Sequence, residues 1–303
     1  MSGFDPTGLV LYVDGDYVDG AEARLSVFDH GLLYGDGVFE GMRVFDGGLF
    51  RPLDHLARLE RSARTIGLAI PLGTEELLSV ICEVVSRSGL QDAHVRPVVT
   101  RGFGAPGLDP WRCERPSLFV MAYPFPPMLG SDPLRLLVGS VVRKAPRSLG
   151  AHVKSLNYLD AIVAKQQAKA AKADDAVMLD ALGAVAECTS TNLFMVVDDV
   201  LVTPTTRAAL PGITRRTVLE IASELGIWAE ERDIWPMELY VADAVFLTGS
   251  GAGIAPVGVI DGHAIATTEH PHFAAVTAAY GERTRDARHL VPVTSTGEGR
   301  RGA

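Results

Sequence analysis

Lysine and cysteine are both scarce in this chain of 303 residues. Only five of its 28 basic residues are lysines, so chemistry that requires a primary amine has five candidates. These are Lys144, Lys154, Lys165, Lys169 and Lys172. The three cysteines lie far apart in the sequence, which excludes a disulfide scaffold and a zinc site made of cysteine alone. His30 and His55 have no metal-ligand spacing with other residues, so we expect structural roles for both and no bound metal.

The chain also lacks excess positive charge and long apolar runs. Its 28 basic and 37 acidic residues give a net charge of −9, whereas a nucleic-acid-binding surface needs a basic face. No apolar run approaches the roughly 20 residues that cross a bilayer, and Met1–Thr7 shows no signal-peptide pattern. We therefore expect a soluble, cytoplasmic protein with no nucleic-acid or membrane partner.

The N-terminal part has the pattern of an antiparallel sheet with two helices. Asp14-Gly15 predicts a tight hairpin turn, and Asp46-Gly47-Gly48 predicts a second one. The expected elements are strands 9–13, 17–18, 38–45, 49–51, 94–100 and 117–123, and helices over about 54–66 and from Thr74 onward. Together they indicate a small α+β domain, residues 1–123, which ends at a proline-rich interdomain linker, residues 124–131.

The second half of the chain again mixes strands and helices. The expected elements are strands 134–142, 176–180, 193–197, 200–203, 244–248 and 257–260, and helices over about 157–173, after Pro211-Gly212, and over 270–288. Within the helix 157–173, an apolar stripe of Leu159, Ile162 and Val163 predicts the buried face. The pattern indicates a larger α+β domain, residues 132–290, followed by a flexible polar tail, residues 291–303.

Position separates Lys154 from the other four lysines. Three lysines lie opposite the apolar stripe, on a face that we expect to be solvated: Lys165, Lys169 and Lys172. Lys144 lies near a strand end, where we expect a surface role. Lys154 directly precedes a predicted helix, and a buried amine there would be nucleophilic because desolvation lowers the pKa of a lysine.

Several other segments have the composition of binding sites. Gly249–Gly253 follows a strand but enters another strand instead of a helix, so it does not fit a dinucleotide-binding fold. Its backbone N–H groups suit a smaller anion, as do those of Pro211–Thr214 at the start of a helix. His94 and Arg96 share one face of a strand, which suits a carboxylate ligand, and Pro97 predicts that this strand lies at a sheet edge. Glu187 is either a surface carboxylate at a strand end or a functional one.

Five short segments carry a more specific pattern, and they follow one another in a fixed order. They are Tyr34–Arg43 (YGDGVFEGMR), His55–Leu59 (HLARL), Lys154–Leu159 (KSLNYL), Glu187–Asn192 (ECTSTN) and Leu210–Arg215 (LPGITR). These segments and their order resemble the class IV (fold-type IV) pyridoxal-phosphate aminotransferases, from about Tyr12 to Asp261. The resemblance implies a two-domain α+β fold whose larger domain is built on a β-barrel-like sheet. It also implies a homodimer with the site at the domain junction.

The resemblance further implies roles for individual residues. Lys154 would form a Schiff base with pyridoxal 5'-phosphate and then move a proton between substrate and cofactor. Glu187 would keep the pyridine nitrogen protonated, and Tyr158 would hydrogen-bond the phenolic oxygen. The cofactor phosphate would be held by Arg58, Ile213, Thr214 and Ser250.

Within the family, Val38–Arg43, Val95–Gly102 and Gly107–Pro110 resemble the branched-chain amino-acid type. This implies ping-pong transfer of the amino group of leucine, isoleucine or valine to 2-oxoglutarate. The implied substrate residues are Tyr34 and Phe39 for the apolar side chain, Arg96 for the distal carboxylate of glutamate or 2-oxoglutarate, and the backbone of Gly251 and Ala252 for the α-carboxylate.

Some positions depart from that type and leave alternatives open. His94 stands where the branched-chain subgroup usually has tyrosine, and Gly253 and Ala255 replace larger polar residues. These changes are compatible with a D-amino-acid or (R)-amine transaminase on the same scaffold. The KSLN and ECTSTN motifs also resemble aminodeoxychorismate lyases, although Glu40–Arg43 fits them poorly. A non-catalytic binding protein would not need Lys154, Tyr158, Glu187 and Arg58 together.

Overall fold

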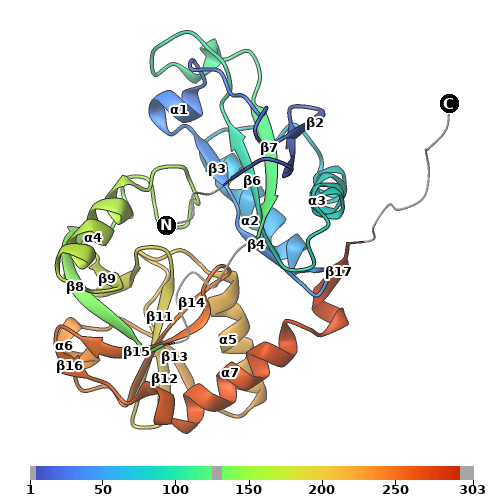
Figure 1. Ribbon diagram of the computed structural model, residues 1–303. Helices are drawn as coiled ribbons and strands as arrows, with labels where there is room; N and C mark the ends of the chain where they lie inside the picture. Colours follow the sequence, from blue (N-terminus) through green and yellow to red (C-terminus); the bar gives the residue numbers. More distant parts are fainter. Residues whose placement is uncertain (1–4, 125–131, 294–303) are drawn as a thin grey trace. The chain divides into compact units, whose positions relative to one another are not determined.

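The computed structural model describes residues 5–124 and 132–293, so most of the predicted linker 124–131 and of the tail 291–303 lies outside the described residues. Within those residues the chain forms two compact units (Figure 1). Unit 1 contains residues 5–124, 154–157 and 284–293, and unit 2 contains residues 132–153 and 158–283. Each unit combines helices with a β-sheet, which confirms the predicted α+β class.

Unit 1 is built on one sheet. Among the described residues, its strands lie in the order β17-β5-β4-β6-β7-β1-β2, and β3 pairs with β6. The strands are β1 (Val10–Val13), β2 (Asp16–Asp19), β3 (Gly37–Phe39), β4 (Met42–Phe45), β5 (Gly48–Phe50), β6 (Ala93–Thr100), β7 (Ser117–Tyr123) and β17 (Leu290–Pro292). The helices are α1 (His30–Tyr34), α2 (Pro52–Thr65) and α3 (Thr74–Ser88), with 3-10 turns η1 (Pro110–Arg112) and η3 (Ala287–His289).

Both predicted hairpin turns are present in unit 1. Asp14-Gly15 joins β1 to β2, and Asp46-Gly47 joins β4 to β5. All four turn residues have positive φ, 49° and 118° in the first turn and 48° and 75° in the second. A two-residue type I′ turn requires this left-handed backbone, which aspartate and glycine adopt at low cost.

Three predictions for unit 1 are wrong. The expected strand 38–45 is two strands, because β3 pairs with the C-terminal half of β6 and β4 with its N-terminal half. The break lies opposite Pro97, which has no N–H group to donate to the ladder. The strand that contains Pro97 is interior rather than an edge strand, since β7 pairs along its other side. The expected tail begins within a strand, because Leu290–Pro292 pairs with β5.

Unit 2 is built on a second sheet, whose described strands lie in the order β10-β9-β8-β15-β14-β11-β12-β13, with β16 paired to β15. The strands are β8 (Leu134–Val142), β9 (Asp175–Leu179), β10 (Val185–Cys188), β11 (Asn192–Val197), β12 (Val200–Thr203), β13 (Ala229–Glu231), β14 (Ala244–Gly249), β15 (Gly253–Ile260) and β16 (His263–Ala264). The helices are α4 (Leu159–Ala170), α5 (Ile213–Glu224), α6 (Pro236–Leu239) and α7 (Pro271–Arg283), with a 3-10 turn η2 (Thr267–Glu269).

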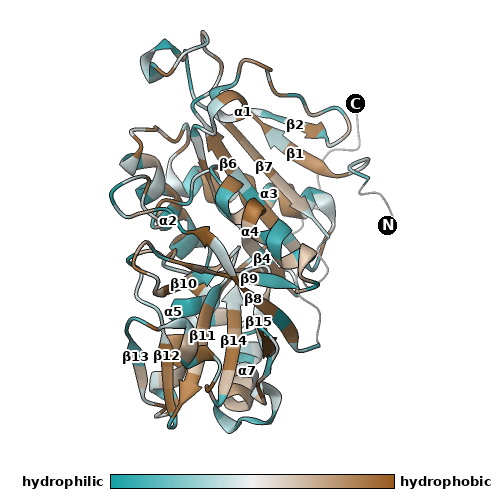
Figure 2. Ribbon diagram, turned by 90° about the vertical axis from the view of Figure 1, so that its left-hand side faces the viewer, coloured by the Kyte–Doolittle hydropathy of each residue, from teal (hydrophilic) through white to brown (hydrophobic). Residues whose placement is uncertain are grey.

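The central strands of unit 2 are buried on both faces, which explains their continuous apolar sequence (Figure 2). In β11, Phe194 and Val196 pack in the cluster that includes α5 and α7. Leu193 and Met195 point to the opposite face and pack in the cluster that includes α6. The turn after β14 leads directly into β15, which confirms that no helix follows Gly253.

Two helices of unit 2 differ from the sequence prediction. In α4 the predicted stripe does not face the core, since Leu159 is 71% exposed and Ile162 is 52% exposed. The helix instead buries Ala161, Ala164 and Ala168, whose small side chains let it approach β8 and β9 closely. The predicted final helix 270–288 ends at Arg283, and the chain then returns to unit 1.

Candidate active site

The segment 154–157 is held like an extra strand against β3 in unit 1. The Phe39 N–H group donates to the Lys154 carbonyl at 3.0 Å, and the Leu156 N–H group donates to the Gly37 carbonyl at 2.9 Å. The Lys154 N–H group donates to Oγ of Ser62 on α2 at 3.1 Å. A Cβ atom on Gly37 would lie 2.7 Å from Leu156 Cδ1, so glycine permits this close approach. The backbone on both sides of Lys154 is therefore fixed.

Two cationic side chains of unit 1 meet the ring of Phe39. Lys154 Nζ lies 4.6 Å from the ring centroid, and the guanidinium carbon of Arg96 lies 4.2 Å from it. The Phe39 side chain is itself buried. Cation–π attraction stabilises charges at such distances, so Phe39 brings the amine of Lys154 and the guanidinium of Arg96 to one apolar surface.

A buried ion cluster lies on the neighbouring strand and helix of unit 1. Glu40 accepts hydrogen bonds from Arg58 Nε at 2.7 Å and Nη2 at 2.8 Å, and Nδ1 of His55 lies 2.7 Å from its Oε2 atom. All three side chains are buried. Burial alone would raise the pKa of Glu40, but the charge and hydrogen bonds of Arg58 and then His55 hold it far below its usual range. Burial lowers the pKa of His55, although the charge and hydrogen bond of Glu40 oppose this shift.

His94 and Tyr34 also belong to unit 1. His94 lies on β6 with its ring 5.3 Å from that of Tyr123. Burial, and then the charges of Arg96 and Arg43, lower the pKa of His94 to about 3, so its imidazole is neutral at physiological pH. The Tyr34 hydroxyl accepts a hydrogen bond from the Gly107 N–H group at 2.8 Å.

In unit 2, the carboxylate of Glu187 is buried within a network of donors. Arg143 donates to Oε1 of Glu187 from Nε at 2.8 Å, and its Nη1 donates to Asp160 Oδ2 at 2.8 Å. The Leu210 N–H group and the Asn192 side-chain amide donate to Oε2 of Glu187 at 3.1 and 3.3 Å. Burial alone would lower the pKa of the Arg143 guanidinium. The negative charges of Glu187 and then Asp160 have the larger effect and raise this pKa. Glu187 is thus not a surface carboxylate, which excludes the first of its two sequence interpretations.

Tyr158 and Lys144 meet in the same unit. The Nζ atom of Lys144 lies 5.7 Å from the centroid of the Tyr158 ring, and the Lys144 side chain is half-buried. Burial lowers the pKa of Lys144, although Asp160 raises it. Lys144 is therefore only partly solvated, and its surface role stays a prediction.

Unit 2 also presents groups that suit an anion. Helix α5 begins at Ile213, and its N-cap Gly212 provides no side-chain hydrogen bond to the first turn. A Cβ atom on Gly212 would lie 2.0 Å from Asn192 Oδ1, so only glycine fits there. The buried Thr248 Oγ1 has no hydrogen-bond partner among the described residues. The turn Ser250–Ala252 follows it, and in this turn the Ala252 N–H group donates to the Gly249 carbonyl at 3.1 Å.

Comparison with known proteins shows which family this chain is similar to. The family model for amino-transferase class IV matches residues 37–260. The chain belongs to the class IV aminotransferases. The branched-chain-amino-acid aminotransferase of Escherichia coli K12 is 33% identical over 262 residues, 83% of this chain and 85% of its own length. A homologue from Methanocaldococcus jannaschii is 44% identical over 279 residues, 92% of this chain and 96% of its own length.

Solved structures of the family are similar along nearly the whole chain. The branched-chain aminotransferase of Thermoproteus uzoniensis with norvaline is 36% identical, with a TM-score of 0.90 over 94% of this chain and 99% of its own. The holo-form of the branched-chain amino acid aminotransferase of Thermobaculum terrenum, with pyridoxal phosphate, is 27% identical, with a TM-score of 0.86 over 96% of this chain and 100% of its own. Class IV aminotransferases use pyridoxal 5'-phosphate, and this chain is a pyridoxal-phosphate enzyme of that class.

The structure groups the sequence-predicted residues by unit. Unit 1 holds Tyr34, Phe39, Arg58, Arg96 and Lys154, and unit 2 holds Tyr158, Glu187, Ile213, Thr214, Ser250, Gly251 and Ala252. Arg143 and the Glu40–His55 pair were not predicted as partners of these residues. The burial of Arg143 could not be predicted, because a position at the end of a predicted strand is usually exposed. For Glu40 and His55, the signal was present in the VFEG and HLARL motifs, which also contain Phe39 and Arg58.

Proposed function

We propose that this protein is a branched-chain amino-acid aminotransferase that moves the amino group of leucine, isoleucine or valine to 2-oxoglutarate by a ping-pong mechanism. The observation that carries the proposal is the placement of Lys154, whose amine lies against Phe39 while its backbone is fixed to β3 and Ser62. Relatives that are 33% and 44% identical to this chain are named for this activity, and a similar solved structure contains norvaline, an apolar amino acid.

The residues of unit 2 suit pyridoxal phosphate. A phosphate dianion would be accepted by the uncapped start of α5 at Ile213 and Thr214, where free N–H groups carry partial positive charge. Ser250 lies two residues after the buried Thr248 hydroxyl, which needs a partner, and would contribute its hydroxyl to the same anion. In unit 1, Arg58 would add a guanidinium whose orientation is set by Glu40. When bound, the cofactor supplies an aldehyde that accepts amino groups and a ring that withdraws electrons.

Three side chains would then perform the chemistry. Lys154 provides the amine, and it would hold and return the proton that leaves the substrate Cα. Glu187 would hold a proton on the pyridine nitrogen, because its buried negative charge favours a cation beside it. Tyr158 would donate a hydrogen bond to the phenolic oxygen and so fix the ring.

Substrate selection would depend on Phe39, Tyr34 and Arg96. The first two present aromatic surface to an apolar side chain. Arg96 would bind the distal carboxylate of glutamate or 2-oxoglutarate, for which a guanidinium fork is well shaped. The backbone of Gly251 and Ala252 would receive the α-carboxylate; because the Ala252 N–H group already bonds within the turn, Gly251 is the better-placed donor.

We further infer that the protein acts as a homodimer in the cytoplasm. Unit 1 exposes apolar side chains around α1 and the loop 103–111, where Phe28 packs edge-to-face on Phe103. Leu108 is 84% exposed and Trp111 is 89% exposed. Monomeric proteins seldom expose large apolar side chains together, whereas an interface between copies would cover them. No described helix is long and apolar enough to span a bilayer, and the three cysteines are unpaired, as a reducing compartment favours.

The test is the visible absorbance spectrum of the purified holoenzyme during addition of L-leucine. We expect a yellow absorbance band that bleaches with leucine, isoleucine and valine and returns with 2-oxoglutarate. Lys154→Ala should abolish the cycle, whereas Lys169→Ala, on the exposed face of α4, should retain it. Bleaching by D-alanine but not by leucine would favour the D-amino-acid or (R)-amine alternative. That alternative was considered because His94 stands where the branched-chain type usually has tyrosine. Pyruvate released without an amino acceptor would favour a lyase.

A further inference from the structure

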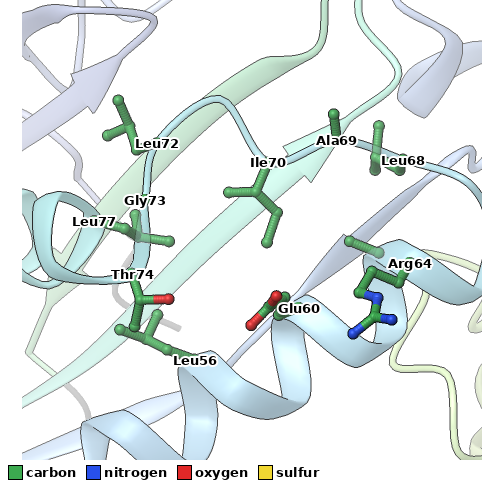
Figure 3. A pocket seen from close by; sticks show the side chains of 11 residues that line it. Leu56, Glu60, Arg64, Leu68, Ala69, Ile70, Leu72, Gly73, Thr74 and Leu77 are labelled. Atoms are coloured by element: carbon green, nitrogen blue, oxygen red, sulfur yellow. The ribbon is translucent and has the colours of Figure 1, made fainter.

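A cleft lies between α2, the loop 67–73 and the start of α3, entirely within unit 1 (Figure 3). Its volume is about 230 Å³. The apolar part of its wall is formed by Leu56, Ala63, Leu68, Ala69, Ile70, Leu72 and Leu77, with Gly73 and Thr74 at one end. This cleft is smaller than the roughly 300–1,000 Å³ of typical sites for drug-sized ligands. A small metabolite therefore fits it better than a nucleotide or a peptide.

Two opposite charges line the otherwise apolar cleft. Glu60 and Arg64 stand one helical turn apart on α2, the spacing and order that favour a Glu–Arg ion pair. Glu83 and Arg87 have the same spacing and order on α3, and they pair at 2.7 Å. In the part of the chain that the structure describes, no ion pair within 4.0 Å joins Glu60 to Arg64. The carboxylate and the guanidinium are thus both available to one ligand that carries an ammonium and a carboxylate.

We propose that this cleft binds a free α-amino acid with an apolar side chain, as a site separate from the catalytic lysine. The ligand carboxylate would pair with Arg64, its ammonium with Glu60, and its side chain would contact Leu56, Ala63 and Leu77. An acid without an ammonium would meet the repulsion of Glu60, and an amine without a carboxylate would meet that of Arg64. The cleft therefore selects the zwitterion.

The position of the cleft on α2 connects it to the functional side chains of unit 1. Arg58 and Ser62 lie two residues before Glu60 and Arg64 respectively, and two residues correspond to about 200° around a helix. The same helix thus presents Ser62 to the Lys154 backbone on one face and the two charges to the cleft on the other. A ligand in the cleft would therefore contact a helix that also holds the catalytic segment. The link to catalysis rests on the proposed function, whereas the binding site itself does not.

Hydrogen–deuterium exchange of the holoenzyme during titration with L-leucine tests the proposal locally. We expect saturable slowing of exchange in peptides that cover residues 67–77, because these peptides form one wall of the cleft. The double variant Glu60→Gln/Arg64→Gln should need at least ten-fold more leucine for the same protection. The matched control Glu83→Gln/Arg87→Gln removes the same charges from a pair that lies outside the cleft, and it should behave as the wild type. Isopentylamine and 4-methylpentanoate, which each lack one charged group of leucine, should give no protection of residues 67–77.

Two results would overturn the proposal. One is unchanged exchange of residues 67–77 at saturating leucine, and the other is equal protection in the Glu60→Gln/Arg64→Gln variant. The absorbance change of the holoenzyme, recorded on the same samples, reports the catalytic site separately. Bleaching without protection of 67–77 would reject the cleft site alone, and protection without bleaching would reject the proposed transaminase function alone.

Discussion

Arg143 Nη2 lies 2.7 Å from Oε1 of Glu187, and both side chains are almost fully buried. The same guanidinium reaches Asp160, so one cation compensates two carboxylates. Arg143 therefore compensates the buried negative charge that the proposed role of Glu187 requires. It acts through Glu187 and is a positioning residue rather than a catalytic one.

Replacing Arg143 should destabilise the protein strongly. Arg143→Met leaves the buried carboxylate of Glu187 and the partly buried carboxylate of Asp160 without their cation, and breaking a buried pair in this way costs about 3–5 kcal/mol. Urea unfolding of the holoenzyme measures the loss, and the exposed Arg147→Met serves as the matched control. Arg143→Lys retains the charge but not the guanidinium fork, so its stability should lie between those of wild type and Arg143→Met. Equal stabilities for Arg143→Met and Arg147→Met would show that the network contributes nothing.

The Glu40 cluster should make stability depend on acid pH. Because the pKa of Glu40 lies well below its usual range in the folded state, its contribution is fully present above the unfolded value of about 4.3. It is lost as the pH falls further, since protonation then favours the unfolded chain. Glu40→Gln should lower stability at pH 7 by about 3–5 kcal/mol and should flatten the decline below pH 5. Denaturant midpoints between pH 7 and pH 3 test both effects, and a variant that declines as steeply as the wild type would contradict the second.

His94 should affect stability in a different pH window. Its folded pKa of about 3 lies below the unfolded value, so between these two values only the unfolded chain binds a proton there. Stability therefore falls as the pH drops below about 6.5, by up to about 1.4 kcal/mol per pH unit for one such group. His94→Phe should remove this slope between pH 6.5 and 4. At pH 8 the imidazole is neutral in both states, so the difference measured there gives the packing contribution. An unchanged slope would mean that His94 is protonated in the folded protein.

Local patterns in the sequence were sufficient for much of the fold. The Asp14-Gly15 and Asp46-Gly47 turns form as predicted because their geometry depends on those two residues alone. Helix α5 begins after Pro211-Gly212 for a similar local reason. In contrast, the buried face of α4 was mispredicted, because the periodicity of large apolar residues does not reveal that alanines allow closer packing.

The partners within the site could not be predicted because they are distant in the sequence. Glu40 and Arg58 are 18 residues apart, and Arg143 and Glu187 are 44 residues apart. A single sequence shows which side chains can form an ion pair but not which of them fold together. The family motifs gave the cofactor residues, whereas the residues that orient Arg58 and compensate Glu187 became visible only through burial and distance.

Gly37 should tolerate no side chain. Gly37→Ala would place a methyl group 2.7 Å from both Leu156 Cδ1 and the Val99 carbonyl oxygen. The Leu156 side chain can rotate but the backbone oxygen cannot, so β3 would have to shift together with the segment 154–157 that it holds. We expect lower stability together with a large loss of activity, because Lys154 would leave the Phe39 ring. Gly281→Ala is the control, since a Cβ there meets no atom within 4 Å and alanine favours a helix by up to about 1 kcal/mol. Wild-type activity in Gly37→Ala would show that the position of the segment is not critical.

The exposed apolar surface of unit 1 should be the contact between two copies of the chain. Leu108→Glu/Trp111→Glu places two charges on side chains that are more than four-fifths exposed in the single chain, so the fold itself should be unaffected. In a dimer the same charges would be desolvated without a partner. The free energy that this desolvation costs is much larger than the free energy that the apolar contact contributes. Light scattering should give the mass of two chains for the wild type and of one chain, 32.3 kDa, for the variant. As a control, Leu182→Glu introduces a charge at an exposed apolar position of unit 2 and should leave the mass unchanged. A variant that keeps the mass of two chains would move the interface away from this surface.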